Sequence, residues 1–99
     1  MTRIEVAPEV FDDFDRFFDY IAQVDAGSAP EHIGGIVEAV QVLATSPMIG
    51  RPVKGGKREL IIGRAFCGYV ALYRYVAPLD AVFVLAMRCR RESGYKSKR

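Results

Sequence analysis

The sequence has few of the residues that build metal sites, disulfide frameworks and redox centres. It contains one histidine, two cysteines and no tryptophan. Cys67 and Cys89 lack the close spacing of metal ligands, and two such cysteines are typical of unpaired thiols in a reducing compartment. We expect no metal ion and no cofactor, and we expect His32 to be solvated or to cap a helix start rather than to act in catalysis.

Long apolar runs are missing as well. No stretch approaches the roughly 20 apolar residues of a membrane span, and residues 2–6 alternate between polar and apolar rather than forming a signal peptide. We therefore expect a cytoplasmic protein with no membrane partner. Apolar residues still make up 51% of the chain, which is typical of a folded protein rather than a disordered one. The length suits a single domain over residues 1–99, with residues 89–99 as a basic C-terminal tail.

Basic side chains are scarce in the first half of the chain and acidic ones in the second. Residues 1–50 carry two basic and nine acidic side chains, whereas residues 51–99 carry twelve basic and three acidic ones. This split predicts two surfaces of opposite sign, of which the basic one suits a polyanion or an acidic partner. Alternatively, the charges of the two halves pair with each other across the fold.

The N-terminal half has the periodicity of a strand followed by a helix. Residues 2–6 predict a short half-buried strand, and Pro8 suits the first turn of the helix that follows. From Val10 to Ile21, apolar residues recur at helical spacing. We expect the phenylalanines of this helix in the core and its aspartates on the opposite face, namely Phe11, Phe14, Phe17 and Phe18 against Asp12, Asp13, Asp15 and Asp19.

A second helix is expected after a break at residues 26–27. Residues 28–31 form a capping-box pattern, and residues 33–44 place apolar side chains on one face. Gly34 and Gly35 lower the helix propensity of this segment. We interpret them as a point of close approach to the first helix.

The second half has the pattern of β-structure. Residues 50–57 are rich in glycine and basic residues and predict a flexible loop. Strands are expected at residues 59–62, 69–76 and 81–88, and the last of these is nearly all apolar, which predicts a central strand. The order β-α-α-β-β-β predicts an α+β fold, in which a two-helix hairpin packs on one face of a mostly antiparallel four-stranded sheet. The short N-terminal strand is expected at an edge of that sheet.

Four short motifs are spread over nearly the whole chain. In order they are Gly50-Arg51-Pro52, Arg58-Glu59-Leu60, Gly68-Tyr69 with Tyr73-Arg74-Tyr75, and Arg91-Glu92-Ser93-Gly94-Tyr95. Their order and spacing resemble the skeleton of the RelE/ParE superfamily, the toxins of type II toxin–antitoxin systems. The sequence is closer to ParE than to RelE, and the resemblance implies a toxin of the plasmid-stabilisation type.

The resemblance also implies a partner and a target. The partner is a cognate antitoxin, which silences the toxin in a hetero-oligomer. The target of ParE-type members is DNA gyrase, and no hydrolytic centre is required for that activity. RelE-type members are instead endoribonucleases that cut mRNA at the ribosome. Because both branches share a fold, the fold does not choose between them, and an inactive member that only binds its partner is a third alternative.

The residues expected of a nuclease are present in part. Such an enzyme needs a base, cations that hold the phosphate and an acid for the leaving oxygen. The resemblance assigns these roles to lysines on the second strand, an arginine on the third, and an arginine and a tyrosine near the C-terminus. Here Lys54 and Lys57 precede the second strand, and Val70 stands where the arginine is expected. The candidate catalytic residues, if the protein is a nuclease, are Arg90, Arg91 and Tyr95.

Six arginines are candidates for binding a partner or nucleic acid: Arg58, Arg64, Arg74, Arg88, Arg90 and Arg91. Guanidinium groups suit carboxylates and phosphates, and the proposed sheet predicts that these residues gather in one basic patch. An antitoxin bound there would block the toxic surface directly. Alternatively, Glu59, Asp80 and the acidic helix neutralise the patch. The missing lysines and arginine favour gyrase inhibition over mRNA cleavage.

Overall fold

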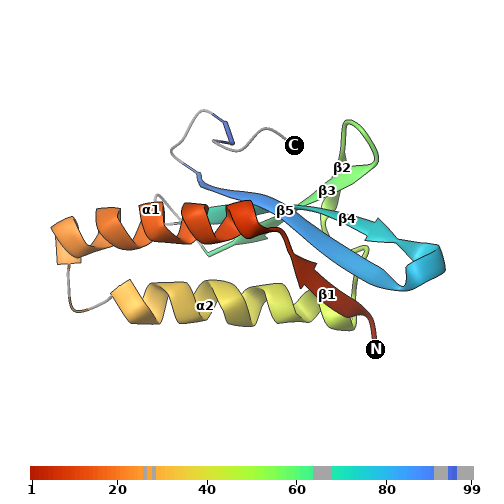
Figure 1. Ribbon diagram of the computed structural model, residues 1–99, viewed down its shortest axis with the longest axis horizontal. Coiled ribbons are helices and arrows are strands. Elements are labelled where there is room, and N and C mark those ends of the chain that lie inside the picture. The colour runs from red at the N-terminus through yellow and green to blue at the C-terminus, as the bar shows by residue number, and fades with distance from the viewer. Residues whose placement is uncertain (26, 28, 64–67, 91–93, 96–99) are drawn as a thin grey trace.

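The computed structural model describes residues 1–25, 27, 29–63, 68–90 and 94–95 (Figure 1). Its elements follow the order expected from the sequence, with one additional strand and two short 3-10 turns. They are β1 (Arg3–Val6), α1 (Pro8–Asp25), α2 (Ala29–Gln41), η2 (Val42–Ala44), β2 (Arg51–Val53), β3 (Lys57–Ile62), β4 (Tyr69–Val76), η4 (Ala77–Leu79) and β5 (Ala81–Cys89).

The strands form one mixed sheet in the order β1-β5-β4-β3-β2. β1 pairs with β5 in parallel at one edge, and the remaining neighbours are antiparallel. The two helices lie side by side and cover one face of the sheet (Figure 1). These observations confirm the predicted α+β fold, with its helical hairpin and its N-terminal edge strand.

The sheet has five strands, and the prediction of four was wrong. The additional strand, β2, lies within residues 50–57, where the sequence indicates a loop, and Arg51 pairs with Glu59 of β3. β2 is three residues long and contains Pro52, so it shows no alternating pattern that would reveal it. Its place at the sheet edge tolerates the missing N–H of proline.

The core lies between the helices and the sheet face that they cover. Alternate residues of β4 point toward it, and Tyr69, Ala71 and Tyr73 belong to the buried cluster. The residues between them, Val70 and Leu72, point to the opposite face, yet both are buried. β4, the middle strand of the sheet, is therefore covered on both sides. The cluster is completed by Val10, Phe17, Ile21, Ile36, Val40, Leu43, Ile62, Val82, Val84 and Met87.

The expected division of α1 into an apolar and an acidic face was partly wrong. Phe17 is buried and Phe14 packs against the core, but Phe11 is 58% exposed and Phe18 is 45% exposed. Residues seven apart share a helix face, so Phe11 and Phe18 lie together on the flank of the buried stripe. Asp13, which was expected in solvent, is 1% exposed because it lies between Val10 and Phe17 on the core side of the helix.

The side chains of Asp13 and Arg16 form hydrogen bonds with the backbone of β5 at the point where its neighbour β1 has ended. The Met87 N–H donates to Asp13 Oδ2 at 2.8 Å, and Arg16 Nη2 donates to the Met87 carbonyl at 3.3 Å. Arg16 Nη1 also donates to Asp13 Oδ1 at 2.8 Å. Two side chains of α1 thus satisfy backbone groups that would pair with β1 if that strand continued.

The close approach predicted at Gly34 and Gly35 was also wrong. A Cβ atom added at either position would meet nothing within 4 Å. The close approach is instead at Gly50, where an added Cβ would lie 2.7 Å from Tyr73 Cε1 and 2.8 Å from the Glu59 carbonyl oxygen. The Gly50 N–H donates to Tyr73 Oη at 2.8 Å, so the chain before β2 rests directly on a core tyrosine.

Other expectations concern residues that the structure does not describe. Ser28 of the capping box and Cys67 lie outside the described residues, so the capping box and the pair of unpaired thiols stay predictions. Among the described residues, no helix has the length and apolar character needed to cross a membrane. The same residues hold no cluster of three or more His, Cys, Asp or Glu side chains suited to a metal ion.

Candidate functional site

The candidate site lies on the sheet face opposite the helices, which we call the open face. Strand register places Arg51, Glu59 and Leu72 in one row across β2, β3 and β4, and it places Arg88 of β5 beside Val70 of β4. Side chains directly opposite each other in paired strands share a face. Because Val70 and Leu72 alternate with the core residues of β4, all five side chains belong to the open face.

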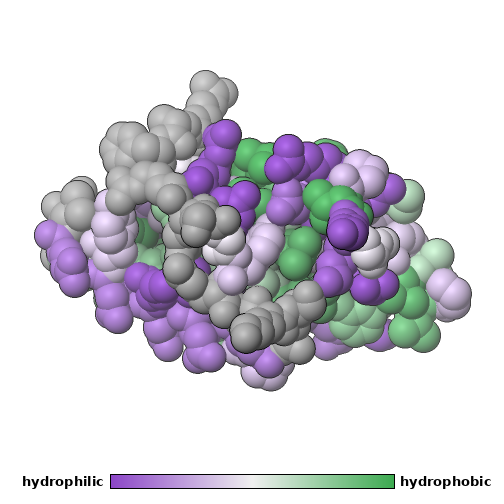
Figure 2. Space-filling view, turned by 90° about the horizontal axis from the view of Figure 1, so that it is seen from above, coloured by the Kyte–Doolittle hydropathy of each residue, from purple (hydrophilic) through white to green (hydrophobic). Residues whose placement is uncertain are grey.

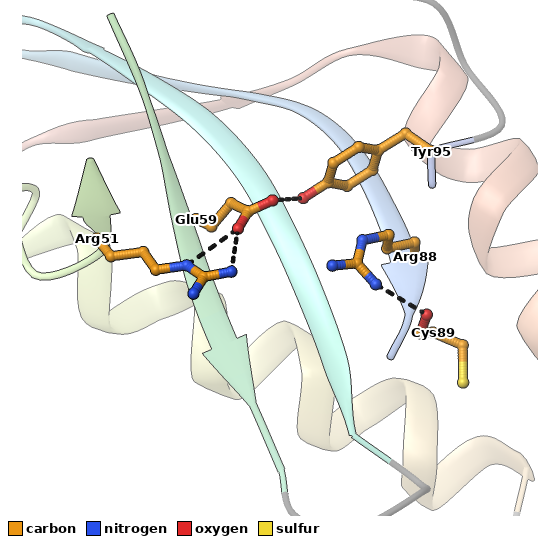
Figure 3. A network of polar contacts seen from close by, with 5 residues as sticks. All are labelled: Arg51, Glu59, Arg88, Cys89 and Tyr95. Carbon is orange, nitrogen blue, oxygen red and sulfur yellow. Dashed lines mark hydrogen bonds and ion pairs between the residues drawn. The ribbon is translucent and has the colours of Figure 1, made fainter. Parts of the chain in front are cut away.

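A set of polar contacts on the open face, the Glu59 network, joins the sheet to Tyr95 (Figure 3). Tyr95 Oη donates to Glu59 Oε2 at 2.7 Å. Arg51 donates to Glu59 Oε1 through Nε at 3.1 Å and through Nη2 at 2.7 Å. The guanidinium carbon of Arg88 lies 5.4 Å from the centre of the Tyr95 ring, within cation–π range. Since Arg88 is on β5 and Glu59 is on β3, Tyr95 spans the intervening strand β4.

The protonation states within the network follow from these contacts. Burial of Glu59, which is 9% exposed, raises the pKa of its carboxyl, but hydrogen bonds from Tyr95 and Arg51 and the charges of Arg51 and Arg88 outweigh it and leave the pKa below the usual value. Burial and the Glu59 carboxylate together raise the pKa of the Tyr95 hydroxyl strongly. At neutral pH, Glu59 is therefore an ionised acceptor and Tyr95 a protonated donor.

This arrangement suits anchoring better than acid–base chemistry. The Tyr95 hydroxyl directs its proton at Glu59, and its raised pKa makes it a poor proton donor near neutral pH. Lys57, expected in the loop before this strand, is instead the first residue of β3, and alternation with Arg58 places it on the same face as Glu59. β3 therefore brings one lysine and one carboxylate to the face where a nuclease of the RelE type is expected to place lysines. Val70, at the position of the expected arginine, is 1% exposed. The network holds Tyr95 in place across the sheet.

The structure separates the arginines that were predicted to form one patch. Arg58 pairs with Tyr73 in the register of β3 and β4, and so it lies on the core side of the sheet. Its Nη1 donates to the Gly50 carbonyl at 2.7 Å, which ties it to the chain entering β2. Arg58 therefore lies on the opposite face of the sheet from Arg74 and Arg88.

The other described arginines are spread over the open face and its margin. Arg74 Nη2 donates to the Gly55 carbonyl at 3.1 Å, beside the turn between β2 and β3. Arg88 contacts Tyr95. Arg90 is exposed, and its N–H donates to the Gly68 carbonyl at 2.9 Å. The remaining two candidates, Arg64 and Arg91, lie outside the described residues.

Sequence reasoning singled out Tyr95 but did not identify Arg51 and Glu59 as its partners. Both residues occur in motifs of the sequence, and Glu59 is the single acidic residue between positions 51 and 79. A lone acid in a basic segment is a signal of pairing. The choice of Arg51 as partner depends on the register of the β2–β3 hairpin, which the sequence did not reveal.

A groove of about 450 Å³ lies between α2 and the end of β3. Gly35 lines it and leaves it open, since a side chain at that position would meet no neighbour within 4 Å. The other lining residues are mainly apolar or uncharged and include His32, Ile36, Ala39, Ile62 and Tyr69. The groove therefore lies between the helical hairpin and the sheet.

Replacing Tyr95 with phenylalanine is expected to raise the pKa of the Glu59 carboxyl, because Glu59 loses its hydroxyl donor. A carboxyl whose pKa is lowered by folding stabilises the fold above its unfolded-state pKa, and this stabilisation is lost as the pH falls through the folded-state value. Tyr95→Phe should therefore lose stability at a higher pH than the parent protein during acid titration. Unfolding curves between pH 7 and about pH 3, together with an NMR titration of the Glu59 carboxyl, measure this.

The matched control is Tyr75→Phe. Tyr75 Oη donates to Asp80 Oδ1 at 3.0 Å, so this variant removes a hydroxyl–carboxylate bond elsewhere in the protein. It should change the pKa of Asp80, which Thr2 and Tyr75 lower by hydrogen bonding, and leave that of Glu59 unchanged. An unchanged Glu59 titration in Tyr95→Phe would contradict the network.

Comparison with protein families places the chain among known toxins. The family model described as "ParE toxin of type II toxin-antitoxin system, parDE" matches residues 4–94. The chain therefore belongs to the ParE toxin family of type II toxin–antitoxin systems. This confirms the resemblance seen in the sequence, including its closeness to ParE. No curated protein matches the chain.

Solved structures agree in fold. A chain from the "Chromosomal ParDE TA system from P. aeruginosa" superposes with a TM-score of 0.76 at 22% sequence identity. The match covers 90% of this chain and 96% of that one. At this identity the likeness establishes the shared fold.

Proposed function

We propose that this protein is a growth-inhibiting toxin that acts on DNA gyrase by binding and that a cognate antitoxin silences it. The observation that supports action by binding rather than by catalysis is the hydrogen bond from Tyr95 Oη to Glu59 Oε2 at 2.7 Å. A tyrosine in this contact positions the chain rather than the reacting atoms of a substrate. Membership of the ParE toxin family supports the toxin role.

Cleavage of mRNA is less well supported because the described residues of the open face do not provide the necessary set of groups. A nuclease of the RelE type needs cations around the scissile phosphate and a general base next to the attacking hydroxyl. In the described part of the open face, Arg51 and Arg88 are engaged with Glu59 and Tyr95. Lys54 lies in the turn that follows β2, and Lys57 begins β3 two residues before Glu59.

An antitoxin partner is supported by apolar surface on the helical side of the molecule. Phe11 and Phe18 are large apolar side chains on one flank of α1, and Val37 of α2 is exposed as well. Exposed aromatic residues are typical anchor points for an amphipathic segment. An antitoxin segment that covers Phe11 and Phe18 and enters the groove beside Gly35 would bury both features.

Controlled expression in bacteria tests the proposal. We expect DNA synthesis to fall and cells to filament while protein synthesis initially continues, and we expect the purified protein to inhibit supercoiling by gyrase. Co-expression of the antitoxin encoded next to the toxin should restore growth.

The alternatives give different results in the same experiment. Rapid arrest of protein synthesis with mRNA cut at the ribosome would overturn the gyrase proposal and favour the nuclease. In that case, alanine at Arg90, Arg91 or Tyr95 should abolish the cleavage. Harmless expression of a folded protein that still binds the antitoxin would indicate an inactive member.

A further inference from the structure

The hairpin formed by β2 and β3 carries the highest density of basic residues in the described part of the chain. Residues 51–58 contain Arg51, Lys54, Lys57 and Arg58 and no acidic residue. The hairpin projects from the body of the sheet at the upper right of Figure 1. In the view from above, hydrophilic and hydrophobic residues are mixed at this end of the molecule (Figure 2). The tip, Lys54 to Lys57, is the turn that joins β2 to β3.

The shape of the tip is fixed by its backbone and by Arg74 of β4. Gly55 and Gly56 have φ values of 84° and 72°, a conformation that favours glycine over other residues. Three-residue hairpin turns commonly use glycine in this way. Arg74 Nη2 donates to the Gly55 carbonyl at 3.1 Å and so holds the turn from the neighbouring strand. The tip is a preformed turn, and ordering it costs little entropy on binding.

The charge of Lys54 is not neutralised within the described residues. Glu59, the nearest acid in the sequence, already accepts from Arg51 and Tyr95. Lys54 is exposed and makes no hydrogen bond or ion pair with any described residue. Arg74 is exposed as well, and it lies beside the turn on the open face. Positive charge therefore accumulates on both sides of a narrow, projecting turn.

The composition of the tip selects the kind of polyanion that it fits. Its four residues are two lysines and two glycines, so it offers no aromatic ring for stacking the bases of a single strand. It also has no apolar side chain that would anchor a protein partner in a pocket. Lysine ammonium groups bind phosphate as point charges, without a fixed orientation. These properties match a regular row of phosphates.

We propose that the β2–β3 hairpin tip, with Lys54, Lys57 and Arg74, binds the phosphate backbone of duplex DNA independently of base sequence. The inference deepens the proposed function and rests on it for its biological setting, because gyrase works on duplex DNA. The hairpin would hold the toxin on the DNA while another surface contacts the enzyme. Direct binding of the hairpin to DNA is a property that can be measured without gyrase.

The test is fluorescence anisotropy with a labelled duplex of about 20 base pairs and the full chain, at salt concentrations from 50 to 200 mM. The logarithm of the binding constant should fall linearly with the logarithm of the salt concentration, by about 0.9 for each phosphate neutralised. The double variant Lys54→Gln with Lys57→Gln should reduce this slope by about 1.8 and weaken binding about tenfold at low salt. Lys54→Gln alone should give half the change in slope.

The matched control is Arg3→Gln on β1, at the opposite edge of the sheet. It also removes one positive charge, from a side chain that pairs with Glu5 at 2.9 Å, and it should leave the slope unchanged. Thermal melting of each variant shows that the fold is kept. An unchanged slope in the double variant, or an equal change in Arg3→Gln, would overturn the inference.

Two further ligands and one enzyme assay distinguish the remaining explanations. Tighter binding to single-stranded RNA or to polyglutamate than to the duplex would overturn the choice of DNA. Gyrase inhibition by a protein that shows no hairpin-dependent DNA binding would overturn the inference and leave the proposed function intact. Hairpin-dependent DNA binding without gyrase inhibition would support the inference and count against the proposed function.

Discussion

Replacing Asp13 with alanine should lower the free energy of unfolding by about 3 kcal/mol. The change removes the acceptor of the Met87 N–H, which is buried and has no strand beside it at this point. It also takes away the carboxylate that Arg16 contacts at 2.8 Å. An unpaired buried N–H costs about 1–3 kcal/mol, and loss of a charged partner adds to that cost. Chemical denaturation of the purified variant measures the effect.

Two variants of the same helix act as controls for Asp13. Asp12→Ala removes an exposed carboxylate one residue away and should change stability by no more than about 0.5 kcal/mol. Asp13→Asn keeps a side-chain oxygen that accepts from the Met87 N–H. Its free energy of unfolding should therefore lie between those of Asp13→Ala and Asp12→Ala. If Asp13→Ala were as stable as Asp12→Ala, the contact with β5 would contribute nothing to the fold.

Replacing Gly50 with alanine should destabilise the protein by about 3 kcal/mol as well. The new Cβ would lie 2.7 Å from Tyr73 Cε1 and 2.8 Å from the Glu59 carbonyl oxygen, which is too close for either to stay in place. Overpacking of this kind costs about 1–3 kcal/mol, and moving Tyr73 also weakens its hydrogen bond from the Gly50 N–H. Denaturant unfolding measures the loss.

The control is the same substitution at Gly35, which should raise the free energy of unfolding rather than lower it. Gly35 lies inside α2 with open space around its Cα, so alanine there improves helix propensity by about 1 kcal/mol without a clash. Equal effects at Gly50 and Gly35 would contradict the close packing at Gly50. The pair separates a steric cost from the general cost of changing a glycine.

The parts of the fold that the sequence predicted are those with local periodicity. The stripe of Val10, Phe17 and Ile21 on α1 follows from helical spacing, and the strand β5 follows from its apolar run. The extent of the core on α1 was less well predicted. Asp13 lies within the buried arc, but in sequence it looks like any other aspartate of an acidic helix. Its role depends on where β1 stops beside β5, which is tertiary information.

The candidate site was predicted in fragments for a similar reason. Tyr95 and Glu59 are 36 residues apart, and their contact depends on the path of the chain across the sheet. Arg58 and Arg74 both occur in strands and were expected together, but strand register assigns them to opposite faces. A shift of one residue reverses the face on which a side chain lies, so a strand prediction without register cannot assemble a basic patch.

The parallel pairing of β1 with β5 has a consequence for the timing of folding during synthesis. Arg3 pairs with Ala81, and Thr2 Oγ1 donates to Asp80 Oδ1 across 78 positions of sequence. On the ribosome, β1 has no strand partner until residues 81–84 have emerged from the exit tunnel. Contacts that are this distant in sequence form slowly, because a long loop must close before they contribute. The sheet is therefore completed only after residues 81–84 are available, and the segment before them is synthesised without its finished structure.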